Sequence, residues 1–131
     1  MEKLLEWTES LSTGYESLDD EHKEIFELIN ELYRAIKSAD LKDNIESIVD
    51  KMVEYTETHF KDEEELFEIY NYEFKENHKL AHKKFVRKSY EFKRDVSKNS
   101  TLVAIQTLNF LRTWWRNHIV SMDRMYMGKL G

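Results

Sequence analysis

Four stretches of the chain repeat hydrophobic side chains at intervals of three and four residues, which is the spacing of one face of an α-helix. They run from about residue 18 to 38, about 41 to 69, about 74 to 96 and about 101 to 127. Short polar segments such as Lys98-Asn99-Ser100 separate them. Because short connections place consecutive helices antiparallel, the pattern predicts an all-α fold, an antiparallel up-down-up-down four-helix bundle.

The segment before the first helix, from about residue 1 to 17, lacks helical periodicity. It is predicted to be a non-helical arm that packs on the bundle, because Trp7 and Leu11 favour burial. Ser17 is the expected N-cap of the first helix, and the acidic side chains of Asp19 and Asp20 suit a helix N-terminus. With 131 residues, the chain is expected to form one domain over its whole length.

The composition narrows the class of protein further. The chain has no proline and three glycines, so helix breakers are scarce, and it has no cysteine, which excludes disulfides and thiolate metal sites. A net charge of −6 without a basic stripe disfavours nucleic acid as a partner. No run approaches the roughly 20 apolar residues of a membrane span, and the N-terminus lacks a signal-peptide core. A cytoplasmic protein without a membrane partner is expected.

Polar side chains interrupt the hydrophobic stripes in a pattern that indicates a metal site. All five histidines of the chain occupy inward-facing positions, namely His22, His59, His78, His82 and His118. A lone histidine in such a stripe is usually an ordinary core residue, but burying several imidazoles without partners costs several kcal/mol each. Because the helices alternate in direction, all five positions lie at the same end of the bundle. The histidines are therefore predicted to form one cluster.

Two carboxylates accompany the histidines. Glu63 follows His59 by one helical turn, and His82 follows His78 by the same interval, which places each pair on one face. Asp123 follows His118 by five residues, about 500° around an ideal helix, so it reaches the cluster only if the last helix is distorted or if it approaches from the edge. Five imidazoles and two carboxylates exceed what one ion takes and suit a dinuclear site, with iron favoured and other metals left open.

Signatures of other sites are missing. No histidine has a glutamate three residues before it, as ferritin-like di-metal bundles require, and phosphate-binding or dinucleotide-binding glycine motifs are absent. Nucleophilic serine catalysis is weakly supported, because no serine has a supporting turn motif.

The motifs together resemble those of a known family. They are Trp7, the segment from Gly14 to Leu18-Asp19-Asp20-Glu21-His22-Lys23, His59-Phe60-Lys61-Asp62-Glu63-Glu64, His78-Lys79-Leu80-Ala81-His82, and Trp114-Trp115-Arg116-Asn117-His118-Ile119 leading to Asp123. Over nearly the whole chain, this pattern is similar to that of the bacterial single-domain hemerythrins. The family is a four-helix bundle with a non-haem di-iron site that binds O2 reversibly.

The resemblance implies a role for each residue of the cluster. His78, His82 and His118 would hold one iron, and His22 and His59 the other. Glu63 and Asp123 would bridge the two ions together with an oxo or hydroxo group. The iron with two histidines would keep a position open for O2 or for a small anion such as azide.

The resemblance also implies a function. The chain is expected to bind O2 for storage, delivery or buffering and not to be an enzyme. The alternatives are a di-iron redox enzyme, such as an oxidase, a peroxidase or a nitric-oxide-handling protein, and an O2 sensor that acts through a separate partner.

Two positions depart from the family pattern. Glu73 follows Tyr72 where the family usually has proline, which is expected to alter only the turn. Trp115 stands where leucine is common, three residues before His118. Either Trp115 faces the O2 pocket and narrows it, or Trp115 points between the helices and Trp114 packs at the pocket.

Overall fold

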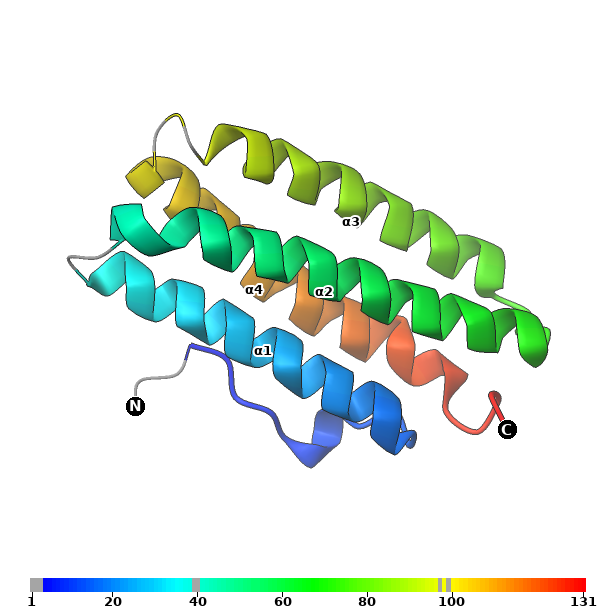
Figure 1. The fold of residues 1–131 in the computed structure, drawn as a ribbon. Coiled ribbons are helices and arrows are strands. Elements are labelled where there is room, and N and C mark those ends of the chain that lie inside the picture. Colours follow the sequence, from blue (N-terminus) through cyan, green and yellow to red (C-terminus); the bar gives the residue numbers. More distant parts are fainter. Residues whose placement is uncertain (1–3, 39–40, 97, 99) are drawn as a thin grey trace.

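A computed structural model describes residues 4–38, 41–96, 98 and 100–131 of the chain, without the side chains of 41–43 and 100. Its helices are α1 (Glu16–Lys37), α2 (Leu41–Ile69), α3 (Lys75–Asp95) and α4 (Ser100–Ser121), with short 3-10 helices η1 (Glu9–Leu11) and η2 (Asp123–Tyr126). Consecutive α-helices run in opposite directions along one another (Figure 1). The predicted all-α antiparallel bundle is therefore confirmed.

The beginning of α1 differs from the prediction. The helix starts at Glu16 with Tyr15 as its N-cap, so Ser17 lies inside the first turn and the predicted Ser17 cap is wrong. Asp19 instead ties the arm to this turn, because its carboxylate accepts hydrogen bonds from the backbone N–H and the hydroxyl of Thr13 (2.9 and 2.8 Å) and from the hydroxyl of Ser12 (2.6 Å). These local bonds outweigh the intrinsic capping preference of Ser17.

The last helix is shorter than predicted. Whereas the hydrophobic pattern extends to about residue 127, α4 ends at Ser121, and Met122 leaves the helical conformation with φ −121° and ψ −54°. The chain then turns into η2, which begins at Asp123. This break changes the direction of the chain next to the predicted metal ligands.

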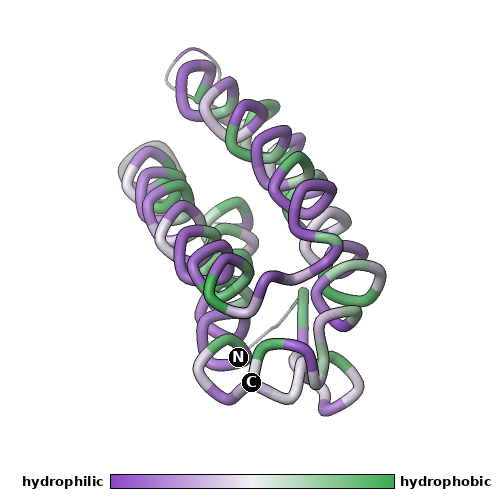
Figure 2. Tube along the Cα trace, turned by 90° about the vertical axis from the view of Figure 1, so that its right-hand side faces the viewer, coloured by the Kyte–Doolittle hydropathy of each residue, from purple (hydrophilic) through white to green (hydrophobic). Residues whose placement is uncertain are grey.

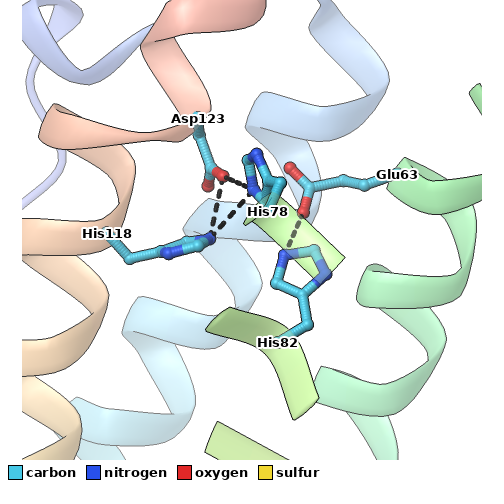
Figure 3. A group of neighbouring side chains, drawn as sticks. All are labelled: Glu63, His78, His82, His118 and Asp123. Atoms are coloured by element: carbon cyan, nitrogen blue, oxygen red, sulfur yellow. Dashed lines mark hydrogen bonds and ion pairs between the residues drawn. The ribbon is translucent and has the colours of Figure 1, made fainter. Parts of the chain in front are cut away.

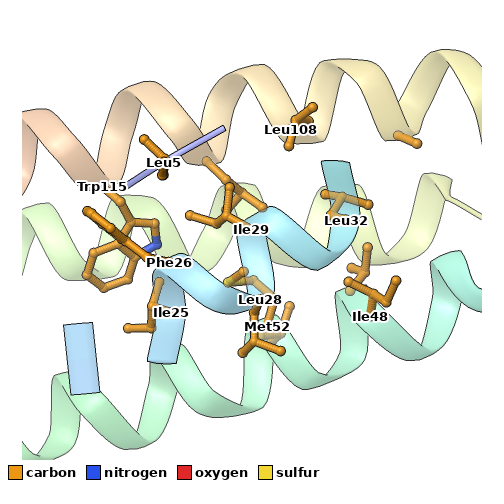
Figure 4. Packing of buried hydrophobic residues seen from close by; sticks show 14 of the residues in the cluster. Leu5, Ile25, Phe26, Leu28, Ile29, Leu32, Ile48, Met52, Leu108 and Trp115 are labelled. Carbon is orange, nitrogen blue, oxygen red and sulfur yellow. The ribbon is translucent and has the colours of Figure 1, made fainter. Parts of the chain in front are cut away.

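The core fills the middle of the bundle. Along each helix, hydrophobic positions recur between hydrophilic ones (Figure 2), and those that face inward form a continuous cluster. Large residues of α1, α2 and α4 meet there, among them Ile25, Leu32, Met52 and Leu108 (Figure 4). Trp115 closes this cluster at the site end and is fully buried. This cluster joins the helices along the bundle. A second, smaller hydrophobic cluster packs at the histidine end, where Phe67 and Tyr126 contact the His78 ring.

The N-terminal arm packs along α1, as predicted (Figure 1). Leu5 and Leu11 are buried, and Trp7 packs against the core. The fully buried Asn30 of α1 holds the arm through three hydrogen bonds of 2.8 Å. Its side-chain oxygen accepts from the backbone N–H of Leu4 and of Leu5, and its side-chain NH2 donates to the Leu5 carbonyl. In the described part of the chain, no helix combines the length and apolarity that crossing a bilayer requires.

Candidate metal centre

All seven residues of the predicted cluster come together at one end of the bundle. There the start of α1, the end of α2, the start of α3 and the end of α4 meet (Figure 1). Each of the seven side chains is at most 5% exposed, and the set comprises His22, His59, Glu63, His78, His82, His118 and Asp123. Seven buried titratable side chains without a common partner would cost far more than a domain of this size gains from folding.

The donor atoms divide into two overlapping groups, within each of which they lie no more than 4.8 Å apart. The three-histidine group contains His78, His82 and His118 with Glu63 and Asp123, and Figure 3 shows these five side chains converging from α2, α3, α4 and η2. The two-histidine group contains His22 and His59 with the same two carboxylates. Both carboxylates therefore lie between two sets of histidines.

Asp123 has the geometry of a bridging carboxylate. Its Oδ1 lies 2.8 Å from Nε2 of His78 and 3.0 Å from Nε2 of His118. Its Oδ2 lies 3.0 Å from Nε2 of His22, on the other side. Each oxygen thus faces a different histidine group.

Glu63 contacts both groups through one oxygen. Its Oε1 is 3.4 Å from Nε2 of His59 and 3.2 Å from Nε2 of His82. Its Oε2 accepts a hydrogen bond of 2.6 Å from the hydroxyl of Tyr126. Oε1 is therefore the oxygen nearest to both groups, while Oε2, which Tyr126 holds, lies 4.0 Å from Nε2 of His22.

These atoms converge without satisfying one another, which is what a metal site requires. Nε2 of His22, His59 and His82, Oε1 of Glu63 and both oxygens of Asp123 are buried and have no partner in hydrogen-bonding geometry within the described structure. Buried polar groups are otherwise almost always paired. Imidazole nitrogens and carboxylate oxygens in these numbers are the ligands of first-row transition metals. The residues therefore fit a pair of such ions.

The end of α4 explains how Asp123 reaches the cluster. On a continuous helix, Asp123 would lie about 140° from His118. Because α4 stops at Ser121 and η2 starts at Asp123, the chain turns at this point and aims the carboxylate at His118. The departure from ideal helix geometry that Asp123 needs is therefore provided by the end of α4.

Three further residues hold the cluster in place, and the sequence pattern did not identify them. Glu21 lies 2.6 Å from Nδ1 of His59, and Glu64 lies 2.8 Å from Nδ1 of His82. A carboxylate on Nδ1 orients the ring so that Nε2 points to the metal, and it makes the ligand more basic. Tyr126, the third residue, positions Glu63. Glu64 belongs to the run Glu63-Glu64-Glu65, which resembles ordinary solvated charge.

The cluster shifts the pKa values of its own members. Burial raises the pKa of Glu63, as does the neighbouring Asp123, but His59 and His82 outweigh both and lower it to about 2. Burial lowers the pKa of His82, but its contacts with the carboxylates of Glu63 (3.2 Å) and Glu64 (2.8 Å) raise it to about 9. In the metal-free fold, His82 therefore favours its protonated form beside the ionised Glu63.

Aromatic rings enclose the cluster. Trp115 is fully buried, and its ring centre lies 6.0 Å from that of His22 and 5.7 Å from that of His59, on the two-histidine side. Trp114 is partly buried and stacks on His118 at 4.3 Å, on the three-histidine side. Phe60 stacks on His82 at 3.7 Å. Trp115 also lies 6.3 Å from the His118 ring, so it borders both histidine groups, whereas Trp114 borders the three-histidine group through His118.

A buried cluster of histidines and bridging carboxylates in a four-helix bundle defines a class of di-metal proteins. Residues 13–130 match the family described as the hemerythrin HHE cation binding domain. A bacteriohemerythrin of Clostridium acetobutylicum is 30% identical over 125 residues, which cover 92% of this chain and 97% of that protein. A myohemerythrin of Theromyzon tessulatum is 33% identical over 125 residues, which cover 95% and 92%.

Solved structures agree with the sequence relatives. A crystal structure of wild-type hemerythrin superposes with a TM-score of 0.89 at 29% identity and covers 97% of this chain and 98% of that one. A point mutant of hemerythrin gives a TM-score of 0.91 at 28% identity, with 98% of each chain covered. The chain belongs to the hemerythrin family.

Proposed function

We propose that the chain binds O2 reversibly at a pair of iron ions, for storage, delivery or buffering of O2. The observation that carries the proposal is that the two donor groups share Glu63 and Asp123 but differ in their histidines, three against two. The ion of the two-histidine group would therefore have fewer protein ligands. An open position of this kind is what a small external ligand requires.

The residues of the cluster would divide between the two ions. His78, His82 and His118 would hold one iron and His22 and His59 the other, with Glu63 and Asp123 between them. Bound ferrous iron supplies the electrons that O2 needs for reversible binding. Glu21 and Glu64 keep the rings of His59 and His82 oriented, through the contacts of 2.6 and 2.8 Å at Nδ1.

Trp115 is proposed to form a wall of the O2 pocket. Its ring borders both histidines of the two-histidine group, whereas Trp114 borders only the other group through His118. On this proposal, the buried indole restricts access to the two-histidine group to molecules as small as O2 or azide. Trp114 is proposed to support the His118 ring.

The visible absorption spectrum of the anaerobically reduced, iron-loaded protein tests the function. We expect a charge-transfer band that appears on addition of O2 and disappears when O2 is removed. An irreversible change to the ferric spectrum would contradict reversible binding and favour a di-iron redox enzyme. Iron analysis of the same sample is expected to give two ions per chain, which separates failed loading from failed O2 binding.

A further inference from the structure

A surface groove runs along the outside of the bundle between the C-terminal half of α2 and the N-terminal half of α3, with a volume of about 1010 Å³. Phe60 and Val86 line it, and Leu80 and Ile69 stand at its edges with 52% and 70% of their surfaces exposed. Exposed apolar side chains beside an apolar groove are typical of a surface that binds another protein.

The two walls of the groove differ in charge. The α2 wall carries four glutamates and one lysine, namely Glu57, Glu64, Glu65, Glu68 and Lys61. The α3 wall carries Lys79 and Lys83 with Glu76. A purely basic partner would be repelled by one wall and a purely acidic partner by the other. A partner that matches both walls must itself present an acidic ridge beside a basic one.

A second copy of this chain presents that arrangement. We propose that two copies pair through this groove about a twofold axis that runs along it. Rotation about such an axis places α2 of one copy over α3 of the other, so each acidic wall meets a basic wall. Twofold interfaces are self-complementary in this manner, because residue i contacts j and j contacts i.

The contacts between α2 and α3 predict which side chains meet. Glu68 pairs with Lys79, and Glu64 with His82, so residues at one level of the antiparallel helices have numbers that sum to 146 or 147. Glu65 therefore lies within about two residues of the level of Lys83. A twofold axis parallel to the groove preserves levels, so Glu65 of each copy faces Lys83 of the other.

The apolar edges match by the same rule. Ile69 of one copy and Leu80 of the other lie within about one helical turn, 5.4 Å, of the same level. Each can cover the other at the open side of the groove. The groove extends along α2 from Glu57 to Ile69, about 18 Å, so the interface is at the small end of stable interfaces and micromolar association is expected.

Sedimentation velocity of the iron-loaded full chain at about 1 to 100 µM tests the pairing. Leu80→Lys is expected to abolish the dimer, because it places a charge in each apolar contact. Leu102→Lys is the matched control, since Leu102 is 54% exposed on α4, lies outside the groove lining and gains the same charge. A native chain that stays monomeric at all concentrations, or two variants that dimerise equally, would overturn the proposal.

A charge exchange makes the test independent of folding defects. Glu65→Lys and Lys83→Glu are each expected to weaken the homodimer about tenfold or more, because each creates two like-charge contacts. Mixing the two variants is expected to restore a heterodimer, in which both contacts again join opposite charges. Failure of the mixture to associate, with both variants folded by circular dichroism, would show that the copies do not meet through these residues.

Discussion

Trp115 is the residue expected to control how fast small ligands reach the cluster, because related chains commonly have the smaller leucine at this position. Its fully buried ring borders His22 and His59, so leucine at this place would open space next to the two-histidine group. We expect Trp115→Leu to bind azide roughly tenfold faster and to lose about 2 kcal/mol of stability from the smaller side chain. Stopped-flow absorption of the ferric protein measures the azide rate.

Trp114→Leu is the control for this prediction, since Trp114 stacks on His118 at the other group. We expect it to leave the azide rate close to the native one. Identical rates for native and Trp115→Leu proteins would show that the indole does not limit entry.

Tyr126 is expected to act through Glu63. Its hydroxyl donates to Oε2 over 2.6 Å in a fully buried position, and Tyr126→Phe removes this donor without changing the ring. We expect metal-free Tyr126→Phe to lose about 1–3 kcal/mol of unfolding free energy in denaturant titrations, and its iron affinity to fall as Glu63 becomes less ordered. Tyr15→Phe removes a different bond, from Leu130 N, and should leave iron affinity unchanged.

Single residues also show how far sequence reasoning extends. His59 and Glu63 were predictable because a single helix fixes their spacing. Glu64 was not predictable, because its role depends on a contact with His82, eighteen residues away on another helix. The hydrophobic pattern of each helix does not determine the register between the two helices. The contact between Tyr126 and Glu63 was also not predictable, because Tyr126 lies in η2 and not in a continuation of the last helix.

At the scale of elements, the position at which α4 ends determines whether Asp123 can reach the cluster. Helical periodicity describes α1, α2 and α3 well but fails at Asp123, because α4 ends two residues before it. The sequence has neither proline nor glycine at this point, so no local signal marks the break. Contacts of Asp123 with the histidines take the place of the missing helical turn.

The arm is an element whose attachment depends on one side chain. Asn30 makes three hydrogen bonds to the backbone of Leu4 and Leu5. We expect Asn30→Ala to lose about 2–3 kcal/mol of unfolding free energy, because the buried N–H and carbonyl of Leu5 and the partly buried N–H of Leu4 lose their partner. Hydrogen exchange should accelerate at Leu5. Asn109→Ala, at an exposed position of α4, serves as control, and unchanged exchange at Leu5 in Asn30→Ala would contradict this attachment.

For the whole molecule, the metals are expected to contribute to folding. Seven buried candidate ligands converge from the four α-helices and η2, so binding energy gained by the metals would be folding energy. We expect chelator-stripped protein to melt at a lower temperature than the loaded protein in calorimetry. His78→Ala should lose one or both irons. Equal melting of the loaded and stripped forms, or two irons retained in His78→Ala, would refute the ligand assignment.

The pH dependence of this difference follows from His82. Its pKa is raised to about 9 in the metal-free fold against an ordinary value of 6.5, so the folded metal-free chain holds a proton that the unfolded chain releases between these values. That contribution to stability is complete below pH 6.5 and is lost as the pH rises to about 9. Metal binding needs the neutral ring, so metal affinity changes in the opposite direction.

The melting difference between loaded and stripped protein is therefore expected to widen from pH 6.5 to 9. Glu64→Gln provides the control, because it removes one of the carboxylates that raise the pKa of His82. In this variant the metal-free fold should hold the His82 proton less strongly, and the difference should change less over the same pH range. A difference that stays constant or narrows in the native protein would mean that His82 is already neutral before the metal binds.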